Sequence, residues 1–260
     1  MTAVLEVKHL RAGYGQKVIL EDISFTVMPK EIRMILGASG CGKSTLLNNI
    51  LKLERAISGT LSFFGEEIPT REPIPDRIRK RTGVLFQGGA LLTNLTVAEN
   101  VELPLRRSYP KLAQKTLDEI AADRLEKVHL LNAFYKFPSE LSGGMRKRAA
   151  LARAIAFEPE LLFCDEPSAG LDPVTSRSLD ELLLELRDSL GISVVIVSHE
   201  LESIRTITDK FIYLKNGRVL MDGTLKDGID SDIPDIHDFF SRSHHNTETD
   251  KQFVHFHFED

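Results

Sequence analysis

Residues 37–45, GASGCGKST, combine the side chains and glycines that bind phosphate groups. The glycines let the backbone turn sharply and aim its N–H groups inward, while Lys43 can reach the terminal phosphates and the Ser44 hydroxyl can hold Mg²⁺. A strand-like apolar run, 32–36, precedes the segment, and apolar residues at helical spacing follow it. An ordinary glycine-serine turn needs none of this context, so we predict that the segment binds a nucleoside triphosphate. Its predicted contacts are Gly37, Ser39, Gly40, Cys41, Gly42, Lys43, Ser44 and Thr45.

A second candidate is the apolar run 161–164, which ends in the carboxylates Asp165 and Glu166. Downstream of a phosphate-binding loop, such a pair fits a metal and water site. Asp165 would lie near the Mg²⁺ held by Ser44, and Glu166 would polarise the water that attacks the γ-phosphate. The alternative is a buried strand followed by an acidic helix cap. Lys43 upstream favours the catalytic interpretation.

Ser142, Gly143 and Gly144 precede a run with helical spacing. A serine followed by glycines in this position predicts a helix N-terminus with a capping hydroxyl and exposed backbone N–H groups. Such a terminus can bind an anion, although a capped helix without a ligand fits the same residues.

The order of these motifs along the chain resembles that of a known protein family. Residues 141–145, LSGGM, resemble the signature sequence of ABC-type ATPases, and they lie between the phosphate-binding loop and the Asp165-Glu166 pair, as in that family. The resemblance implies that the chain binds ATP and Mg²⁺, hydrolyses ATP, and forms a homodimer that ATP closes. Residues 142–144 of one copy would contact the γ-phosphate held by the other. Met145 stands where most of the family has Gln, which puts a side-chain contact at this position in doubt.

Further positions match functional residues of the resembled family. Tyr14 resembles the aromatic residue that stacks on adenine, and Gln87 the glutamine that senses Mg²⁺ and the attacking water. Asp172 resembles the loop that crosses the dimer, although with Pro173 it can also start a helix. His199 resembles the histidine that contacts the γ-phosphate. Taken singly, these are ordinary packing, surface or loop residues, so the predicted roles depend on the resemblance.

Within this family the sequence is similar to the ATPases of Mla/Mce-type (Mkl-like) lipid transport systems. That similarity implies a peripheral protein at the cytoplasmic face of the bacterial inner membrane. Two ATPase copies would drive integral-membrane permease subunits, together with an Mce-domain lipid-binding component and a small STAS-like regulator. The cargo would be phospholipid or another hydrophobic molecule, and its direction stays open. The segments that carry the similarity are 83–91, 95–105, 141–145 and 148–154.

The composition is that of a folded globular protein. The chain has 260 residues, 42% hydrophobic and 27% charged, and its net charge of −5 gives no reason to expect a nucleic-acid partner. Cys41 and Cys164 both fall in nucleotide-site motifs, which favours reduced thiols in the cytosol over a disulfide. No apolar run reaches the length of a membrane span, so we expect membrane contact only through a partner.

Alternating strands and helices must position these residues. Strands alternating with long helices predict an α/β fold with a parallel sheet, at whose carboxyl edge the phosphate-binding loop, Asp165 and His199 would meet. Asn216 and Gly217 predict a hairpin turn, and residues 13–15 another turn. The predicted strands are 2–9, 23–28, 61–64, 82–86, 161–165 and 193–198, and the predicted helices are 96–128, 144–157 and 173–190.

With the resemblance added, the predicted fold is an ABC-type P-loop NTPase. It has a parallel core sheet, an antiparallel β-subdomain and an inserted helical subdomain at about 88–160. We assign the ATPase domain to 1–228 and a C-terminal extension to 229–260. The histidines of the extension lack fixed spacing to Cys or carboxylates, which favours a polar tail over a metal site. Its phenylalanines predict docking on another surface, for instance on a second copy; these are Phe239, Phe240, Phe253, Phe256 and Phe258.

The segment 87–101 is a candidate groove for a cytoplasmic helix of the permease. Leu95 and Val97 fit equally well in the core of the helical subdomain, so this assignment stays open. Other functions also remain: an ABC ATPase for a different cargo, a non-transport ABC ATPase, or a non-catalytic nucleotide-gated module. The chain lacks the second ATPase unit or coiled-coil insertion that is usual in relatives acting on nucleic acid. The complete set of predicted catalytic residues disfavours the non-catalytic module.

Overall fold

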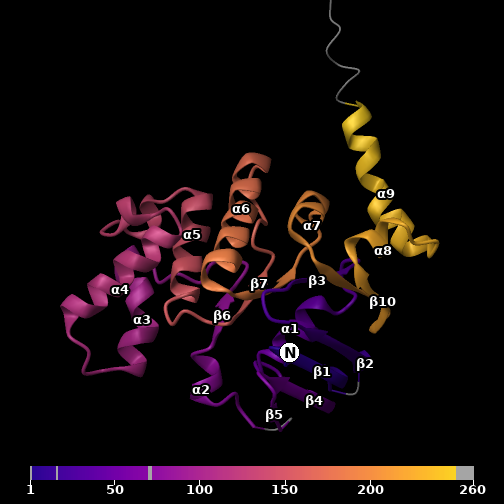
Figure 1. The fold of residues 1–260 in the computed structure, drawn as a ribbon, viewed down its shortest axis with the longest axis horizontal. Coiled ribbons are helices and arrows are strands. Elements are labelled where there is room, and N and C mark those ends of the chain that lie inside the picture. Colours follow the sequence, from indigo (N-terminus) through magenta and orange to yellow (C-terminus); the bar gives the residue numbers. More distant parts are fainter. Residues whose placement is uncertain (1, 16, 70–71, 250–260) are drawn as a thin grey trace, which may run out of the picture.

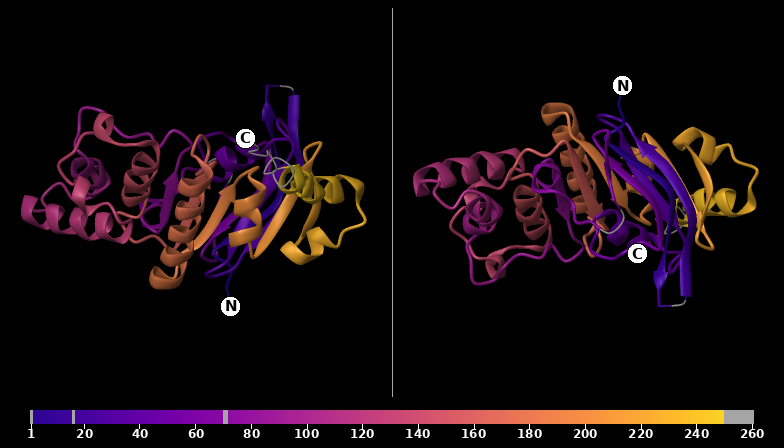
Figure 2. Two further views of the ribbon diagram at one scale, coloured as in Figure 1. Left: turned by 90° about the horizontal axis from the view of Figure 1, so that it is seen from above. Right: turned by 90° about the horizontal axis from the view of Figure 1, so that it is seen from below.

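The computed structural model describes residues 2–15, 17–69 and 72–249, and its strands gather in the middle of the molecule. Helices from residues 97–154 lie at one end, and the helices that follow residue 224 lie at the other (Figures 1 and 2). Within the described residues, no helix combines the length and the apolar character that crossing a bilayer demands.

The core sheet has the strand order β10-β9-β3-β8-β7-β6, and every neighbouring pair is parallel except β9 and β10. All residues of β3 and β8 are buried, as expected for parallel strands covered on both faces. β9 and β10 are joined by Asn216 and Gly217, whose φ angles of 50° and 73° suit the predicted hairpin turn. The strands are β3 (Ile32–Gly37), β6 (Thr82–Leu85), β7 (Leu161–Asp165), β8 (Ser193–Val197), β9 (Lys210–Lys215) and β10 (Arg218–Thr224).

A second, antiparallel sheet has the order β2-β1-β4-β5. Helix α1 (Lys43–Ile50) packs with it against one face of the core sheet, where Leu46 and Ile50 share a buried cluster with Val195 and Val197. The strands are β1 (Leu5–Tyr14), β2 (Lys17–Val27), β4 (Ser58–Phe63) and β5 (Glu66–Ile68). β1 is longer than predicted, because Gly13 and Tyr14 continue its pairing with β2.

Helices α5, α6 and α7 cover the opposite face of the core sheet, where Met34, Cys164 and Val194 belong to the second buried cluster. The predicted helix 96–128 is in fact two helices. Tyr109 precedes Pro110 and has ψ 69°, outside the helical range, because proline disfavours a helical residue before it. The helices are α2 (Asp76–Arg79), α3 (Val97–Ser108), α4 (Gln114–Lys127), α5 (Gly143–Ala154), α6 (Pro173–Leu190) and α7 (Leu201–Ile207), with 3-10 turns η1 (Leu131–Ala133) and η2 (Pro138–Glu140).

The C-terminal extension packs on the core sheet of its own chain. It forms α8 (Leu225–Ile229), which contains the predicted domain boundary, and α9 (Pro234–Thr249). The Phe240 ring lies 5.5 Å from that of Phe211, and the Phe239 ring lies 5.4 Å from that of Tyr213, both measured between centroids. These two phenylalanines therefore dock on β9 and not on a second copy. The remaining phenylalanines and the last histidines of the predicted tail lie outside the described residues.

We expect Phe240→Ala to destabilise the whole domain, because Phe240 is only 3% exposed and packs against a central strand. Truncating a buried phenylalanine costs about 3–5 kcal/mol. Urea unfolding followed by circular dichroism measures the free energy of unfolding. His237→Ala, on the exposed side of the same helix, is the control and should change it by less than about 0.5 kcal/mol. Equal stabilities for the two variants would show that α9 is not part of the folded core.

Candidate active site

The carboxyl ends of β3, β7 and β8 bring the predicted site residues to one edge of the core sheet. Val197 of β8 pairs with Ile35 of β3 on one side and with Asp165 of β7 on the other, so β7 and β8 end level and β3 continues two residues farther, to Gly37. The phosphate-binding loop, Glu166 and His199 follow these strands directly, and Gln87 follows β6 at the same edge. The site is thus assembled from residues that are far apart in the sequence.

The phosphate-binding loop has a backbone that only glycine fits at its two ends. Gly37 and Gly42 have φ angles of 144° and 109°. A Cβ atom on Gly37 would overlap the Leu214 carbonyl oxygen, and one on Gly42 would lie 2.6 Å from Leu20 Cδ2. Lys43 folds over the loop, where its Nζ donates to the Gly37 carbonyl at 2.8 Å and to the Ala38 carbonyl at 3.1 Å. The ammonium is therefore held above the loop.

The N-terminus of α1 opens into this loop without a side-chain cap. Gly42 is the N-cap, and the first turn contains no acidic residue. The first N–H groups of a helix lack partners within the helix and carry a partial positive charge, which favours an anion. A Cβ atom on Gly40 would meet no heavy atom within 4 Å, so the loop is open there. The loop, the helix end and Lys43 together form a site for phosphate groups.

Glu166 and His199 form a hydrogen-bonded pair across the edge from the loop. His199 Nδ1 lies 2.9 Å from Glu166 Oε1 and 2.8 Å from Oε2. Because an ionised carboxylate only accepts hydrogen bonds, Nδ1 donates, which directs the other ring nitrogen away from Glu166. The Glu166 backbone has φ 47°, in the left-handed region, and its N–H donates to the Val197 carbonyl at 2.9 Å. This arrangement suits a carboxylate that accepts a proton from water.

The chemistry of Asp165 fits a divalent cation. Burial, and next the charge of Glu166, raise the pKa of Asp165 above its usual value, while Lys147 opposes this shift. A bound cation would reverse the shift by stabilising the ionised form. Among the described residues there is no cluster of three or more metal-binding side chains. Mg²⁺ commonly takes one or two carboxylates and completes its shell with phosphate oxygens and water, so Asp165 and Ser44 fit it better than a metal that needs several protein ligands.

Lys147, on α5, is a contact that the sequence did not predict. Its Nζ donates to the Gln87 carbonyl at 2.6 Å and to the Glu166 carbonyl at 3.2 Å. No motif marks this lysine, and a lysine within a helix is usually exposed. Only the three-dimensional packing of α5 against the sheet edge reveals it.

The signature segment starts α5, as predicted. Ser142 is the N-cap, and its Oγ accepts from the Met145 N–H at 3.3 Å. The first turn of α5 lies against the start of α6, where a Cβ on Gly144 would overlap Thr175. Across the described residues, no hydrogen bond joins 142–144 to 37–45. Contacts of residues 142–144 with a triphosphate therefore stay a prediction.

Asp172 and Tyr14 have local partners. Asp172 Oδ1 accepts from the N–H groups of Val174 and Thr175, so it caps α6, which was the alternative to a role across the dimer. Hydrogen bonds from Thr175, with lesser contributions, lower the pKa of Asp172. Tyr14 is 52% exposed, and its hydroxyl donates to Glu54 Oε1 at 2.9 Å beside α1. Contacts of these residues with a nucleotide or a second copy stay predictions.

Known proteins are similar to this chain in sequence and in fold. A sequence profile of the ABC transporter family matches residues 20–169. The intermembrane phospholipid transport system ATP-binding protein MlaF of Escherichia coli (strain K12) is 42% identical over 223 residues, which are 85% of this chain and 82% of MlaF. The probable ribonucleotide transport ATP-binding protein mkl of Mycobacterium leprae is 34% identical over 244 residues, which are 93% of this chain and 70% of mkl.

A solved structure also matches this one. It is the dimeric structure of a post-hydrolysis state of the ATP-binding cassette MJ0796 bound to ADP and Pi. The match has a TM-score of 0.74 and 31% sequence identity, and it covers 85% of this chain and 98% of that chain.

We expect Glu166→Gln to lower kcat for ATP hydrolysis by about 10²–10⁴-fold, because the amide cannot accept the proton of the attacking water. The affinity for ATP should stay within about twofold, since Lys43 and the end of α1 are unchanged. Phosphate release and calorimetric ATP binding measure the two quantities. Glu160→Gln is the matched control, because Glu160 pairs with Arg81 at the surface. Turnover of the Glu166 variant at the wild-type rate would contradict its assignment as the base.

Proposed function

The chain belongs to the ABC transporter family, and we propose that it is the ATPase of a complex that moves phospholipid at the cytoplasmic face of a bacterial inner membrane. Family membership confirms the predicted α/β fold of the ABC type, the cofactors ATP and Mg²⁺, and ATP hydrolysis. ATPases of this family pair and work with membrane permease subunits. The 42% identity with MlaF over 85% of the chain carries the proposal of a lipid cargo.

In the proposed reaction, the triphosphate lies in the loop before α1, with Lys43 balancing its charge. Ser44 and Asp165 would hold Mg²⁺, which would neutralise the charge that develops on the phosphate oxygens. Gln87 would sense the Mg²⁺ and the attacking water. Glu166 accepts a proton from the attacking water, and His199 holds the carboxylate in place from its exposed side. The 2.8 Å contact between these two side chains supports this division of roles.

The second copy completes the site in this proposal. Ser142 caps α5 by accepting from the Met145 N–H, and the N–H groups of Gly143 and Gly144 beside it are suited to a γ-phosphate. In this proposal they meet the triphosphate that the partner holds. Binding energy released on closure would then be available to rearrange the permease. ATP would act as the contact that joins the two copies.

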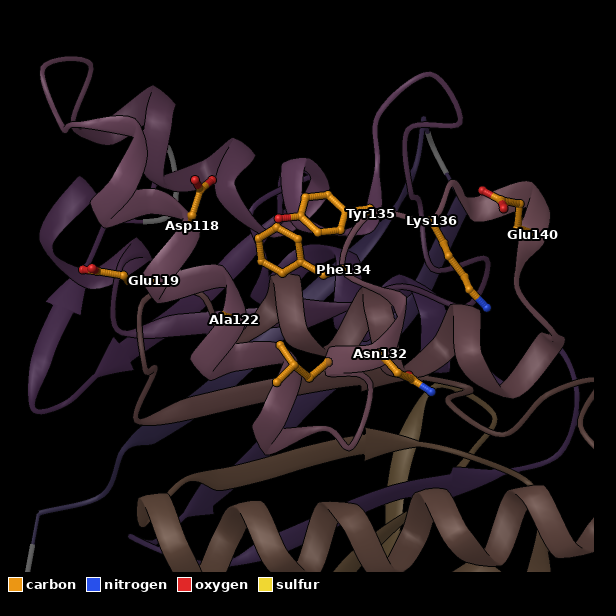
Figure 3. A pocket seen from close by; sticks show the side chains of 9 residues that line it. Asp118, Glu119, Ala122, Asn132, Phe134, Tyr135, Lys136 and Glu140 are labelled. Atoms are coloured by element: carbon orange, nitrogen blue, oxygen red, sulfur yellow. The ribbon is translucent and has the colours of Figure 1, made fainter.

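A surface pocket in the helical block is a candidate site for the permease. It has a volume of about 570 Å³, and Tyr135, which is 83% exposed, stands at its rim (Figure 3). Its carboxylates complement the Lys and Arg residues that are enriched in cytoplasmic loops of membrane proteins. Its lining residues are Asp118, Glu119, Ala122, Leu131, Asn132, Phe134, Tyr135, Lys136 and Glu140.

The pocket connects to the helix that follows the Gln87 segment. The N–H groups of Val97 and Ala98, at the start of α3, donate to the carbonyls of Lys136 and Phe134 at 2.8 Å and 3.1 Å. Val97 and Val101 themselves are fully buried in the helical block. They are therefore core residues and do not line a groove, whereas Leu92 is 43% exposed, so the groove predicted at 87–101 stays a prediction beside the pocket.

Affinity purification from detergent-solubilised membranes tests the proposal. We expect the wild-type chain to co-purify with a multi-spanning permease and bound phospholipid, identified by mass spectrometry. Glu119→Lys should reduce permease recovery by about tenfold, since reversing a charge opposes basic loops, while basal ATP hydrolysis stays unchanged. Glu126→Lys, exposed on the same helix outside the pocket, is the control. A permease that carries a water-soluble cargo would contradict the lipid assignment, and equal recovery with both variants would contradict the docking site.

A further inference from the structure

We propose that Lys147 is a positioning residue for ATP hydrolysis, which holds the carbonyl groups of Gln87 and Glu166 in fixed relation to α5. This inference deepens the proposed function, because it concerns the same reaction. The Nζ atom donates to the Gln87 carbonyl at 2.6 Å and to the Glu166 carbonyl at 3.2 Å. Lys147 is 7% exposed, so water does not compete strongly for these hydrogen bonds.

The Glu166 backbone needs such support. Its φ of 47° lies in the left-handed region, which a non-glycine residue adopts at some cost, so the contacts on either side of it help to hold this conformation. On one side its N–H donates to the Val197 carbonyl at 2.9 Å, and on the other its carbonyl accepts from Lys147. Both peptide groups are thereby fixed. If the backbone relaxed to an extended conformation, the carboxylate would leave the place from which it reaches His199.

The groups around Lys147 can stabilise a buried ammonium. Burial lowers the pKa of Lys147, while Cys164, Asp165, Glu166 and Glu200 act in the opposite direction. A buried ammonium is costly unless acceptors surround it, and here Nζ donates to the carbonyls of two predicted catalytic residues.

A second cationic side chain of α5, Arg153, also donates hydrogen bonds to the segment that follows β6. Arg153 Nη1 donates to the Ala90 carbonyl at 2.6 Å, and Nη2 donates to the Gly89 carbonyl at 2.7 Å. Lys147 and Arg153 therefore fasten the segment 87–90 along α5. Because Ser142 caps the start of α5, a shift of this helix on contact with a partner's triphosphate would move the Gln87 segment and the Glu166 backbone together.

Lys147→Met tests the inference, since it removes the ammonium and keeps a long side chain. We expect kcat to fall by about 10–100-fold, as displacement of a catalytic group by about 1 Å produces, with KM and the Kd for ATP within about twofold. Arg148→Met is the matched control. Arg148 lies on the same helix and donates to the Val128 carbonyl at 2.9 Å and to Ser178 Oγ at 2.8 Å, away from the site. Its loss should keep kcat within about twofold.

A double variant separates positioning from general destabilisation. Because Lys147 holds Glu166 as well as Gln87, adding Lys147→Met to Glu166→Gln should lower the residual single-turnover rate by a smaller factor than Lys147→Met lowers the wild-type rate. A multiplied loss, a wild-type kcat for Lys147→Met, or equal effects of Lys147→Met and Arg148→Met would overturn the inference. Different results would contradict the proposed function: a wild-type chain that does not hydrolyse ATP, or one that does not co-purify with a lipid-carrying permease.

Discussion

The parallel pairing of Val197 with Ile35 on one side and Asp165 on the other is the constraint on which the site depends. Because β7 and β8 end at the same level and β3 ends only two residues farther along, at Gly37, the residues that follow them meet at one edge of the sheet. A shift in register by one residue would turn every side chain of a strand to the opposite face, where a different buried cluster packs. The two clusters, one under α1 and one under α5 to α7, therefore hold the geometry of the site as well as the stability of the fold.

Opposite charges face each other across this edge. The start of α1 and Lys43 present positive charge, whereas Asp165 and Glu166 present carboxylates of which the first is half-buried and unfavourably ionised. In the proposed reaction, a nucleotide with its cation would satisfy both sides at once, because the phosphates would meet the helix end and the metal would meet the carboxylate. The same principle applies at the start of α5, which has donors of the same kind. In the proposed pair of copies, the triphosphate held by one copy would meet this second terminus in the other.

Local motifs predicted the parts of the site whose chemistry lies in contiguous residues. The phosphate-binding loop, the Asp165-Glu166 pair and the capped start of α5 could be read directly, because each places its functional groups within a few residues of a strand or helix end. Pro110 could have predicted the end of α3. The apolar residues at helical spacing on both sides of it instead suggested one continuous helix. The hydrogen bonds of Lys147 and the contact of Phe240 with Phe211 could not be predicted from the sequence, since both depend on which distant elements pack together. Val97 was ambiguous for the same reason: its spacing fits a core or a groove, and only packing distinguishes them.

In the proposed assembly, each ATP is bound between two copies of the chain. An experimental structure of the ATP-loaded Glu166→Gln assembly, in which hydrolysis does not remove the ligand, tests this arrangement. We expect residues 37–45 of one copy and Ser142 of the other to contact the same triphosphate. A structure in which each triphosphate touches a single chain, with Ser142 facing solvent, would contradict it.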